Sequence, residues 1–177
     1  MAEETENTTE ELEDAVRNDP DLRDAAALGI VHRNVAWSTA AGVVPVPLAD
    51  MVLVGAAQVK MLKELTDLYG VAFTDNLGKS LISTLIGSYL PVSLGVGSVG
   101  SLAKAVPGVG SILGLITTPV LAGAATYAVG KVFVQHFESG GTLLDFNPAT
   151  MREHFQTEFK EGKNAAKSAA SGKSKAA

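Results

Sequence analysis

Cysteine is absent from this sequence, so the chain can form no disulfide, no thiolate nucleophile and no cysteine-based zinc site. Charged side chains are also scarce, because Asp, Glu, Lys and Arg make up 19% of the residues, whereas soluble domains carry about 25%. The net charge of −5 provides no strongly basic surface, and we therefore expect no nucleic-acid partner. Together, the low charge and an apolar content of 46% indicate contact with membrane lipid.

The 177 residues suffice for one compact unit with tails. Their charge is uneven, because acidic residues cluster between Glu3 and Asp24 and lysines recur between Lys160 and Lys175. We predict an acidic N-terminal segment with a short helix (1–24), an apolar helical domain with two hairpins (25–142), an amphipathic helix (143–162) and a flexible Lys/Ala/Ser tail (163–177). The predicted fold class is all-α, with Gly-rich apolar helices in a membrane-associated protein.

The first predicted hairpin surrounds two prolines. Apolar positions recur at helical spacing in residues 21–37, and a second helix is expected over 48–69. Pro45 and Pro47 separate these helices because proline lacks the N–H donor of a helix interior, although Pro47 suits a first helical turn. Each apolar arm beside the prolines is shorter than the roughly 20 residues that cross a bilayer, which favours a re-entrant or interfacial hairpin.

The second predicted hairpin has longer arms. Residues 80–103 and 105–130 contain no charged side chain, and each stretch is long enough to span a bilayer. A turn is expected at residues 107–110, where proline and glycine occur together. Because Lys79 and Lys131 flank the pair, we expect a transmembrane hairpin in the bacterial inner membrane with both termini in the cytoplasm.

Small residues recur at every fourth position along the second of these stretches. Such residues let two helix backbones approach closely, which promotes helix association in membranes. The predicted packing stripe consists of Gly110, Gly114, Thr118, Ala122, Thr126 and Gly130. It packs either within the monomer or between copies, so a homo-oligomer is one of two expectations.

The motifs that could support catalysis are incomplete. Gly78-Lys79-Ser80 resembles the end of a phosphate-binding loop, but Phe73 occupies the position of the first glycine. The histidines are widely separated, and no Gly-x-Ser-x-Gly motif occurs. We therefore expect no catalytic residue, no cofactor and no metal site, and we predict that the chain is not an enzyme.

Asp50 is the only charged residue between Arg33 and Lys60. Its carboxylate either lies in the first turn of a helix, where the helix dipole favours it, or faces Gln58, Lys60 or Lys104 as part of an ion path. The sequence leaves both interpretations open.

Met151, Phe155 and Phe159 are spaced four residues apart after Asn147-Pro148, on one face of the predicted amphipathic helix. They form either an intramolecular packing face or a face for a protein partner.

Several motifs occur in a fixed order along the chain. The first group comprises Trp37 and Gly42, Pro45-Val46-Pro47 with Asp50, Gln58 with Lys60-Met61, and Tyr69-Gly70; the second comprises Pro107-Gly108 with Gly110, Thr126-Tyr127-Ala128 with Gly130, His136-Phe137-Glu138, and Gly140-Gly141-Thr142. In this order they resemble the YcjF-like bacterial family called domain of unknown function 697, over approximately residues 25–163. The resemblance implies a helical membrane-associated protein with no established catalytic residues. Some members carry the domain behind a small GTPase domain, so a separate GTPase is an expected partner.

These observations favour a membrane-associated helical scaffold or adaptor that is anchored by an apolar hairpin. One alternative is a small ion or solute-transport module that uses Asp50. Another is a soluble helical bundle that binds an apolar ligand or a GTPase partner. The residues singled out as the structural or functional motif are Pro45, Pro47, Asp50, Gln58, Pro107, Gly108 and Gly110.

Overall fold

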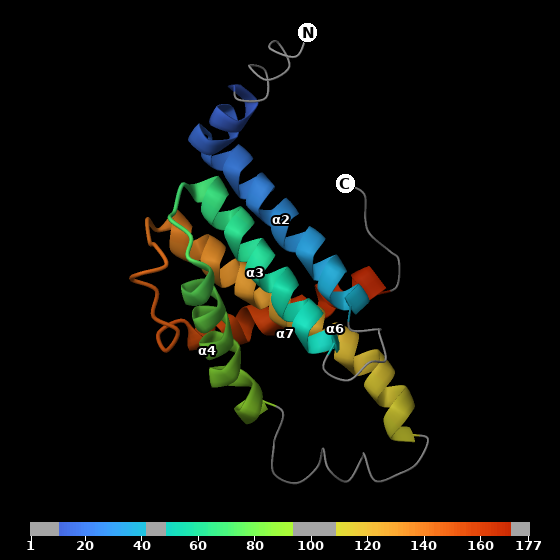
Figure 1. Ribbon diagram of the computed structural model, residues 1–177. Helices are drawn as coiled ribbons and strands as arrows, with labels where there is room; N and C mark the ends of the chain where they lie inside the picture. Colours follow the sequence, from blue (N-terminus) through green and yellow to red (C-terminus); the bar gives the residue numbers. More distant parts are fainter. Residues whose placement is uncertain (1–10, 42–48, 94–108, 171–177) are drawn as a thin grey trace.

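The computed structural model describes the backbone of residues 11–41, 49–93 and 109–170, and the side chains of 11–41, 52–88 and 119–168. Residues 11–18 form a first helix. The longer helices are α2 (Pro20–Ala41), α3 (Ala49–Tyr69), α4 (Asp75–Ser93), α6 (Val109–Glu138) and α7 (Arg152–Ala170) (Figure 1). No strand occurs within these ranges, which confirms the predicted all-α fold.

The boundary between the first helix and α2 is set by Asp19 and Pro20. The Asp19 carboxylate accepts hydrogen bonds from the backbone N–H groups of Asp21 at 2.9 Å and Leu22 at 3.3 Å, so it caps α2. Pro20 occupies the first helical position, where its missing N–H has no consequence. The short acidic helix predicted within residues 1–24 therefore ends before Asp19 and Pro20.

Glycines in the left-handed conformation end α3 and α6. Gly70 has φ of 66° and Gly140 has φ of 80°, a region that other residues rarely adopt. In each case the residue after the glycine donates its N–H to a carbonyl five positions earlier: Val71 to Thr66 at 2.8 Å, and Gly141 to His136 at 3.0 Å. Both ends therefore form Schellman caps, which satisfy otherwise unpaired carbonyls.

Helix α6 lies at the centre of the bundle and contacts α2, α3, α4 and α7. Figure 1 shows α2 and α3 running side by side in opposite directions. The largest fully buried side chains come from several helices and include Phe133, Phe155, Phe159, Met61, Leu62, Leu65, Leu85, Val31 and Val129. One continuous core therefore joins the five longer helices, because each of these supplies side chains to it.

Close helix approach around α6 depends on glycine. A Cβ atom on Gly123 would lie 2.7 Å from the Cβ of Ala166 in α7, and one on Gly130 would lie 2.6 Å from Val31 in α2. A Cβ on Gly162 of α7 would lie 2.8 Å from the carbonyl oxygen of Ala124. These separations are shorter than van der Waals contact, so α2 and α7 pack on α6 only because these positions carry no side chain.

The predicted transmembrane hairpin is not supported. In the part of the chain that the structure describes, no helix is long and apolar enough to cross a membrane. Helix α4 contacts α3 and α7 as well as α6, whereas α6 packs chiefly against α7 and α2, so the two predicted arms do not form a simple pair. The glycines of α6 allow α2 and α7 to pack against its apolar surface.

Two of the predicted domain boundaries fall inside helices. Helix α2 continues across residues 24 and 25, and α7 continues across residues 162 and 163. The predicted flexible tail from residue 163 is therefore wrong up to Ala170, because Ala166 is fully buried beside Gly123 of α6. Helix α7 also begins at Arg152 rather than directly after Pro148, since residues 148–151 form turns.

Candidate functional site

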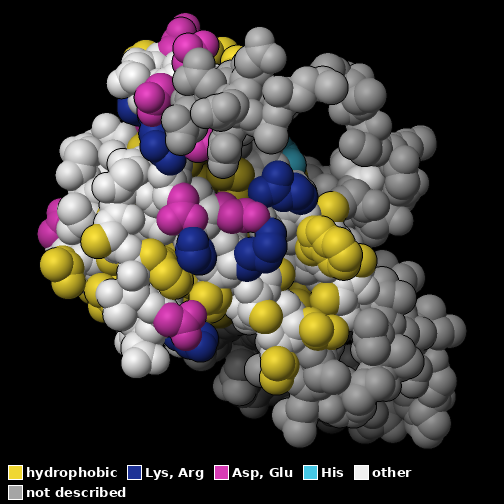
Figure 2. All heavy atoms as spheres, turned by 45° about the horizontal axis from the view of Figure 1, so that its top comes forward, with side chains coloured by type: hydrophobic (Ala, Val, Ile, Leu, Met, Phe, Trp, Pro, Cys, Tyr) yellow, Lys and Arg dark blue, Asp and Glu magenta, His cyan; other side chains and the backbone are white. Residues whose placement is uncertain are grey.

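Exposed hydrophobic side chains gather where α2 ends and α3 begins. Trp37 is 68% exposed, Val52 is 70% exposed and Leu53 is 48% exposed, which is unusual for side chains of this size. Figure 2 shows hydrophobic side chains gathered on this face, with basic and acidic side chains bordering them. This end of the two helices is therefore apolar, and a charged region lies next to it.

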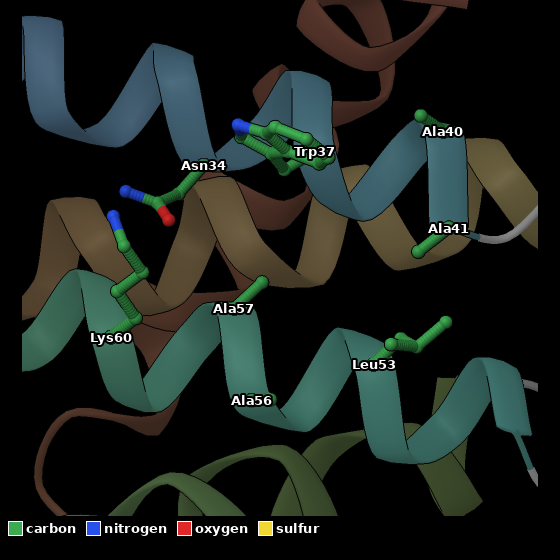
Figure 3. Close-up of a pocket in the computed structure, with 8 residues that line it drawn as sticks. All are labelled: Asn34, Trp37, Ala40, Ala41, Leu53, Ala56, Ala57 and Lys60. Atoms are coloured by element: carbon green, nitrogen blue, oxygen red, sulfur yellow. The ribbon is translucent and has the colours of Figure 1, made fainter.

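A groove of about 630 Å³ runs between α2 and α3 at this position (Figure 3). Its lining residues are Asn34, Trp37, Ala40 and Ala41 from α2, and Leu53, Ala56, Ala57 and Lys60 from α3. The alanines have short side chains and leave the space between the two helix backbones unfilled. Figure 3 shows Asn34 and Lys60 together at one end of the groove, whereas Ala41 and Leu53 lie toward the other end. The groove is therefore amphipathic along its length.

The polar end of the groove is built around Glu64. Its Oε2 atom accepts hydrogen bonds from Arg33 Nη2 and Asn34 Nδ2, both at 3.0 Å, and its Oε1 atom accepts one from Lys60 Nζ at 2.5 Å. Burial alone raises the pKa of Glu64, but the hydrogen bonds from Lys60, Asn34 and Arg33 outweigh it, so the pKa is lowered. Two cations share one carboxylate, which leaves a net positive charge on this cluster.

The lowered pKa of Glu64 predicts a stability that depends on pH. The folded state stabilises the ionised carboxylate of Glu64 more than the unfolded chain does. This contribution to the free energy of unfolding is complete above the ordinary pKa of about 4.5 and is lost as pH falls through the lowered pKa. In Glu64→Gln, urea unfolding midpoints are therefore expected to fall less steeply with decreasing pH below about 5. Equal slopes for the two proteins would contradict this assignment.

A buried chain of hydrogen bonds links three helices behind the groove. Gln58 Nε2 of α3 donates to Thr126 Oγ1 of α6 at 3.2 Å, and Thr126 Oγ1 donates to Ser38 Oγ of α2 at 2.9 Å. All three side chains are buried, with at most 3% exposed. Buried polar groups contribute to stability only when they are paired, so this chain fixes the positions of α2 and α3 against α6.

Removing Thr126 from this chain tests its contribution. Thr126→Val keeps the side-chain shape but leaves Gln58 and Ser38 buried without this partner, which is expected to cost about 1–3 kcal/mol. The matched control is Thr84→Val, because Thr84 is exposed and bonds only to Ser80 of its own helix. Its effect is expected to stay within about 0.5 kcal/mol in urea unfolding. Equal effects of the two substitutions would contradict a structural role for the buried chain.

The structure brings together only part of the predicted motif. Gln58 belongs to the buried chain, and Asp50 lies in the first turn of α3, although its side chain lies outside the described residues. Gly110 belongs to the first turn of α6, and its contacts lie outside the described residues. The prolines at 45, 47 and 107 and the glycine at 108 also lie outside the described residues.

The described part of the small-residue stripe packs within the monomer. Gly130 is in close contact with Val31 and Met61, Thr126 belongs to the buried chain and Ala122 is partly buried. Gly114 and Thr118 belong to α6, but their surroundings lie outside the part of the chain whose side chains the structure describes.

The aromatic stripe on α7 faces the core. Phe155 is fully buried and Phe159 is 1% exposed, whereas Met151 is partly buried against the same core. The ring centroids of Phe155 and Phe159 lie 6.0 Å apart. As placed in this monomer, the two phenylalanines are not available to a protein partner.

A second polar cluster lies on α7 beside Tyr127 of α6. His154 Nε2 lies 3.8 Å from Glu158 Oε1, and Glu158 is 9% exposed. Burial, followed by the charges of Glu158 and Glu161, raises the pKa of Tyr127. Among the described side chains, Arg152 Nε, His154 Nε2 and Glu158 Oε2 are buried without a hydrogen-bond partner. Within the same residues no group of three or more His, Asp or Glu side chains could hold a metal ion.

The cluster around Glu64 and the groove beside it were not predicted from the sequence. Hydrogen bonds join Arg33 and Asn34 of α2 to Glu64, which lies 31 and 30 positions later, and no local motif marks such a contact. The available signal was the helical spacing of Lys60 and Glu64, which favours an ion pair on one face of α3.

Comparison with known proteins identifies the family. The family model described as a domain of unknown function, DUF697, matches residues 7–164, which include the groove and most of α7. The chain belongs to this family. Magnetosome membrane protein 22 of Magnetospirillum gryphiswaldense is 40% identical to this DUF697 chain over 141 residues, which cover 80% of the chain and 72% of that protein. No solved structure matches the chain. The family resemblance that the sequence motifs indicated is thereby confirmed.

Proposed function

We propose that this chain is a membrane-associated helical scaffold or adaptor that acts by binding rather than by catalysis. The observation that best supports this proposal is the group of exposed hydrophobic side chains at one end of the α2–α3 pair: Trp37, Val52 and Leu53. Exposed apolar groups that are grouped in this way are typical of surfaces that contact lipid or another protein.

The arrangement of the helix ends supports lipid as the contact. Figure 1 shows the C-terminal ends of α2 and α4 and the N-terminal ends of α3 and α6 directed toward the same side of the bundle. The sequences that connect these helices along the chain contain little charge: residues 42–48 include no charged residue, and residues 94–108 include only Lys104. An uncharged sequence is favourable in contact with hydrocarbon, whereas each Asp, Lys or Arg is unfavourable there.

The relative supplies the second support. Magnetosome membrane protein 22 is by its name a membrane protein, and it shares 40% identity with this chain across most of both lengths. We extend the membrane location to this chain, with the bacterial inner membrane as the compartment and both termini in the cytoplasm.

Membrane fractionation of cells that express the tagged full chain tests the proposal. We expect the chain in the membrane pellet, with retention after carbonate treatment and both termini protected from protease in spheroplasts. Recovery of the untreated chain in the soluble fraction would reject membrane association. Release by carbonate alone would reject anchoring by apolar segments and leave peripheral binding.

A pair of charge substitutions connects the location to the apolar end. Leu53→Glu places a carboxylate there, whereas Leu144→Glu places one on a leucine that is 88% exposed in the connection between α6 and α7. We expect Leu53→Glu to lower the membrane-to-soluble ratio about fivefold, from a cost of about 1 kcal/mol at the membrane interface, and Leu144→Glu to change it less than twofold. Equal effects of the two variants would show that the apolar end does not contact the membrane.

A further inference from the structure

We propose that the α2–α3 groove binds one acyl chain of an anionic phospholipid, whose head group lies against Lys60 and Arg33. This inference rests on the proposed membrane association and names the lipid class and the residues that recognise it.

The charge at the polar end is complementary to an anionic head group. Arg33 and Lys60 both bind Glu64, so two positive charges face one negative charge. One turn along α3, Lys63 pairs with Asp67 at 2.7 Å, and that pair is neutral. The uncompensated positive charge therefore lies at the groove rather than evenly along α3. Both cations keep half or more of their side-chain surface exposed, which leaves N–H groups available to phosphate oxygens.

The rest of the groove fits a hydrocarbon chain. Its floor is formed by alanines of α2 and α3, and the rings of Trp37 and the side chain of Leu53 border it. Lys60 and Leu53 are seven positions apart on α3, which corresponds to about 10 Å at 1.5 Å per residue. A volume of about 630 Å³ is in the range of pockets that hold small molecules.

The direction of the groove matches the orientation of a lipid in a bilayer. From Lys60 the groove runs toward Ala41 and Leu53, near the ends of α2 and α3 that lead into the uncharged residues 42–48. With that end toward the membrane, a head group at Lys60 lies farther from the hydrocarbon than the acyl chain does. An anionic phospholipid can therefore occupy the groove without inverting its normal orientation.

Trp37 is the only tryptophan of the chain and lines the groove, so its fluorescence reports on the occupant. The probe is the full chain mixed with vesicles of phosphatidylglycerol and phosphatidylcholine, compared with vesicles of phosphatidylcholine alone. With the phosphatidylglycerol vesicles we expect the emission of Trp37 to shift to shorter wavelength and to be quenched by brominated acyl chains. The shift is expected to weaken with added salt, because the head-group contact is ionic.

Two lysine substitutions separate the groove from the general charge of α3. Lys60→Gln removes the lysine at the groove, and Lys63→Gln removes one of similar exposure from a neutral pair on the same helix. We expect Lys60→Gln to weaken partitioning onto phosphatidylglycerol vesicles about fivefold, as for one basic residue near an anionic surface, and Lys63→Gln to weaken it less than twofold. Circular dichroism of both variants confirms that the helices are intact.

Each other outcome is decisive. If the full chain sediments with neither kind of vesicle, both the proposed function and this inference are rejected. Sedimentation with an unshifted Trp37 spectrum, or equal effects of the two lysine variants, would leave membrane association in place and overturn the lipid site. A concentration-dependent shift of Trp37 without vesicles would show that a second copy occupies the groove, and would also overturn it.

Discussion

Phe155→Ala is expected to lower the free energy of unfolding by about 3–5 kcal/mol, a large fraction of the roughly 5–15 kcal/mol that stabilises a typical domain. Phe155 is fully buried on α7, and its ring lies 6.0 Å from that of Phe159. Truncation removes the buried ring and leaves a cavity that the surrounding helices fill only in part. Urea unfolding followed by circular dichroism measures the loss.

The control for this substitution is Leu144→Ala. Leu144 is 88% exposed, so its truncation is expected to change the free energy of unfolding by less than about 0.5 kcal/mol. The comparison also separates the two interpretations of the aromatic stripe. An unchanged unfolding midpoint for Phe155→Ala, together with loss of a protein partner, would contradict the core position and support a partner face.

Helix boundaries could be predicted from the sequence where a local cap determines them. The pairing of Asp19 with Pro20 marks the start of α2, and Gly70 and Gly140 mark the ends of α3 and α6. These signals are local because the capping groups and the backbone groups they satisfy lie within a few residues of one another. The all-α class follows from the same evidence and from the spacing of apolar residues.

Whether lipid or other helices cover the apolar helices could not be predicted from the sequence. An uncharged stretch such as residues 105–130 is favourable against lipid and also against other helices, because both surroundings exclude water. In α6, Gly123 and Gly130 determine that other helices cover the apolar surface, because they allow α7 and α2 to pack closely against it. Glycine at fourth positions indicates close packing, but it does not identify the helix that packs.

The candidate site depends on contacts between distant residues. Gln58 was singled out from the sequence as part of a possible ion path, and the structure shows it bonded to Thr126, 68 positions later. Glu64 was not singled out, because its partners on α2 are brought near only when α2 and α3 align in opposite directions. Trp37 was named only as a motif residue of the family, and the alanines that create the groove carry no signal in the sequence.

The end of α7 shows why composition alone misled the prediction of a flexible tail. Residues 163–177 contain only Lys, Ala, Ser, Gly and Asn, a composition that resembles a disordered segment. However, Ala166 is fully buried, and Gly162 meets the backbone of α6 at Ala124. Small residues bury little area each but allow close backbone contact, so a helix can pack tightly with few large hydrophobic side chains.

Gly162→Ala is therefore expected to destabilise the fold, although alanine has the higher helix propensity. The added Cβ atom would lie 2.8 Å from the carbonyl oxygen of Ala124 and 3.0 Å from its Cα. These are backbone atoms of the central helix and cannot rotate away, so α7 must shift outward. Overpacking of this kind costs about 1–3 kcal/mol, which exceeds the gain of up to about 1 kcal/mol from propensity. Chemical unfolding monitored by circular dichroism measures the net effect.

Gly29→Ala provides the matched control within α2. Gly29 is exposed, and a Cβ atom there would meet no atom within 4 Å, so only the propensity acts. Its substitution is expected to stabilise the protein by up to about 1 kcal/mol, opposite in sign to the effect at Gly162. Stabilisation by both substitutions would mean that α7 does not pack against α6 at this distance. Opposite signs would show that the last turns of α7 belong to the folded unit, because steric overlap at Gly162 has no effect on an unpacked tail.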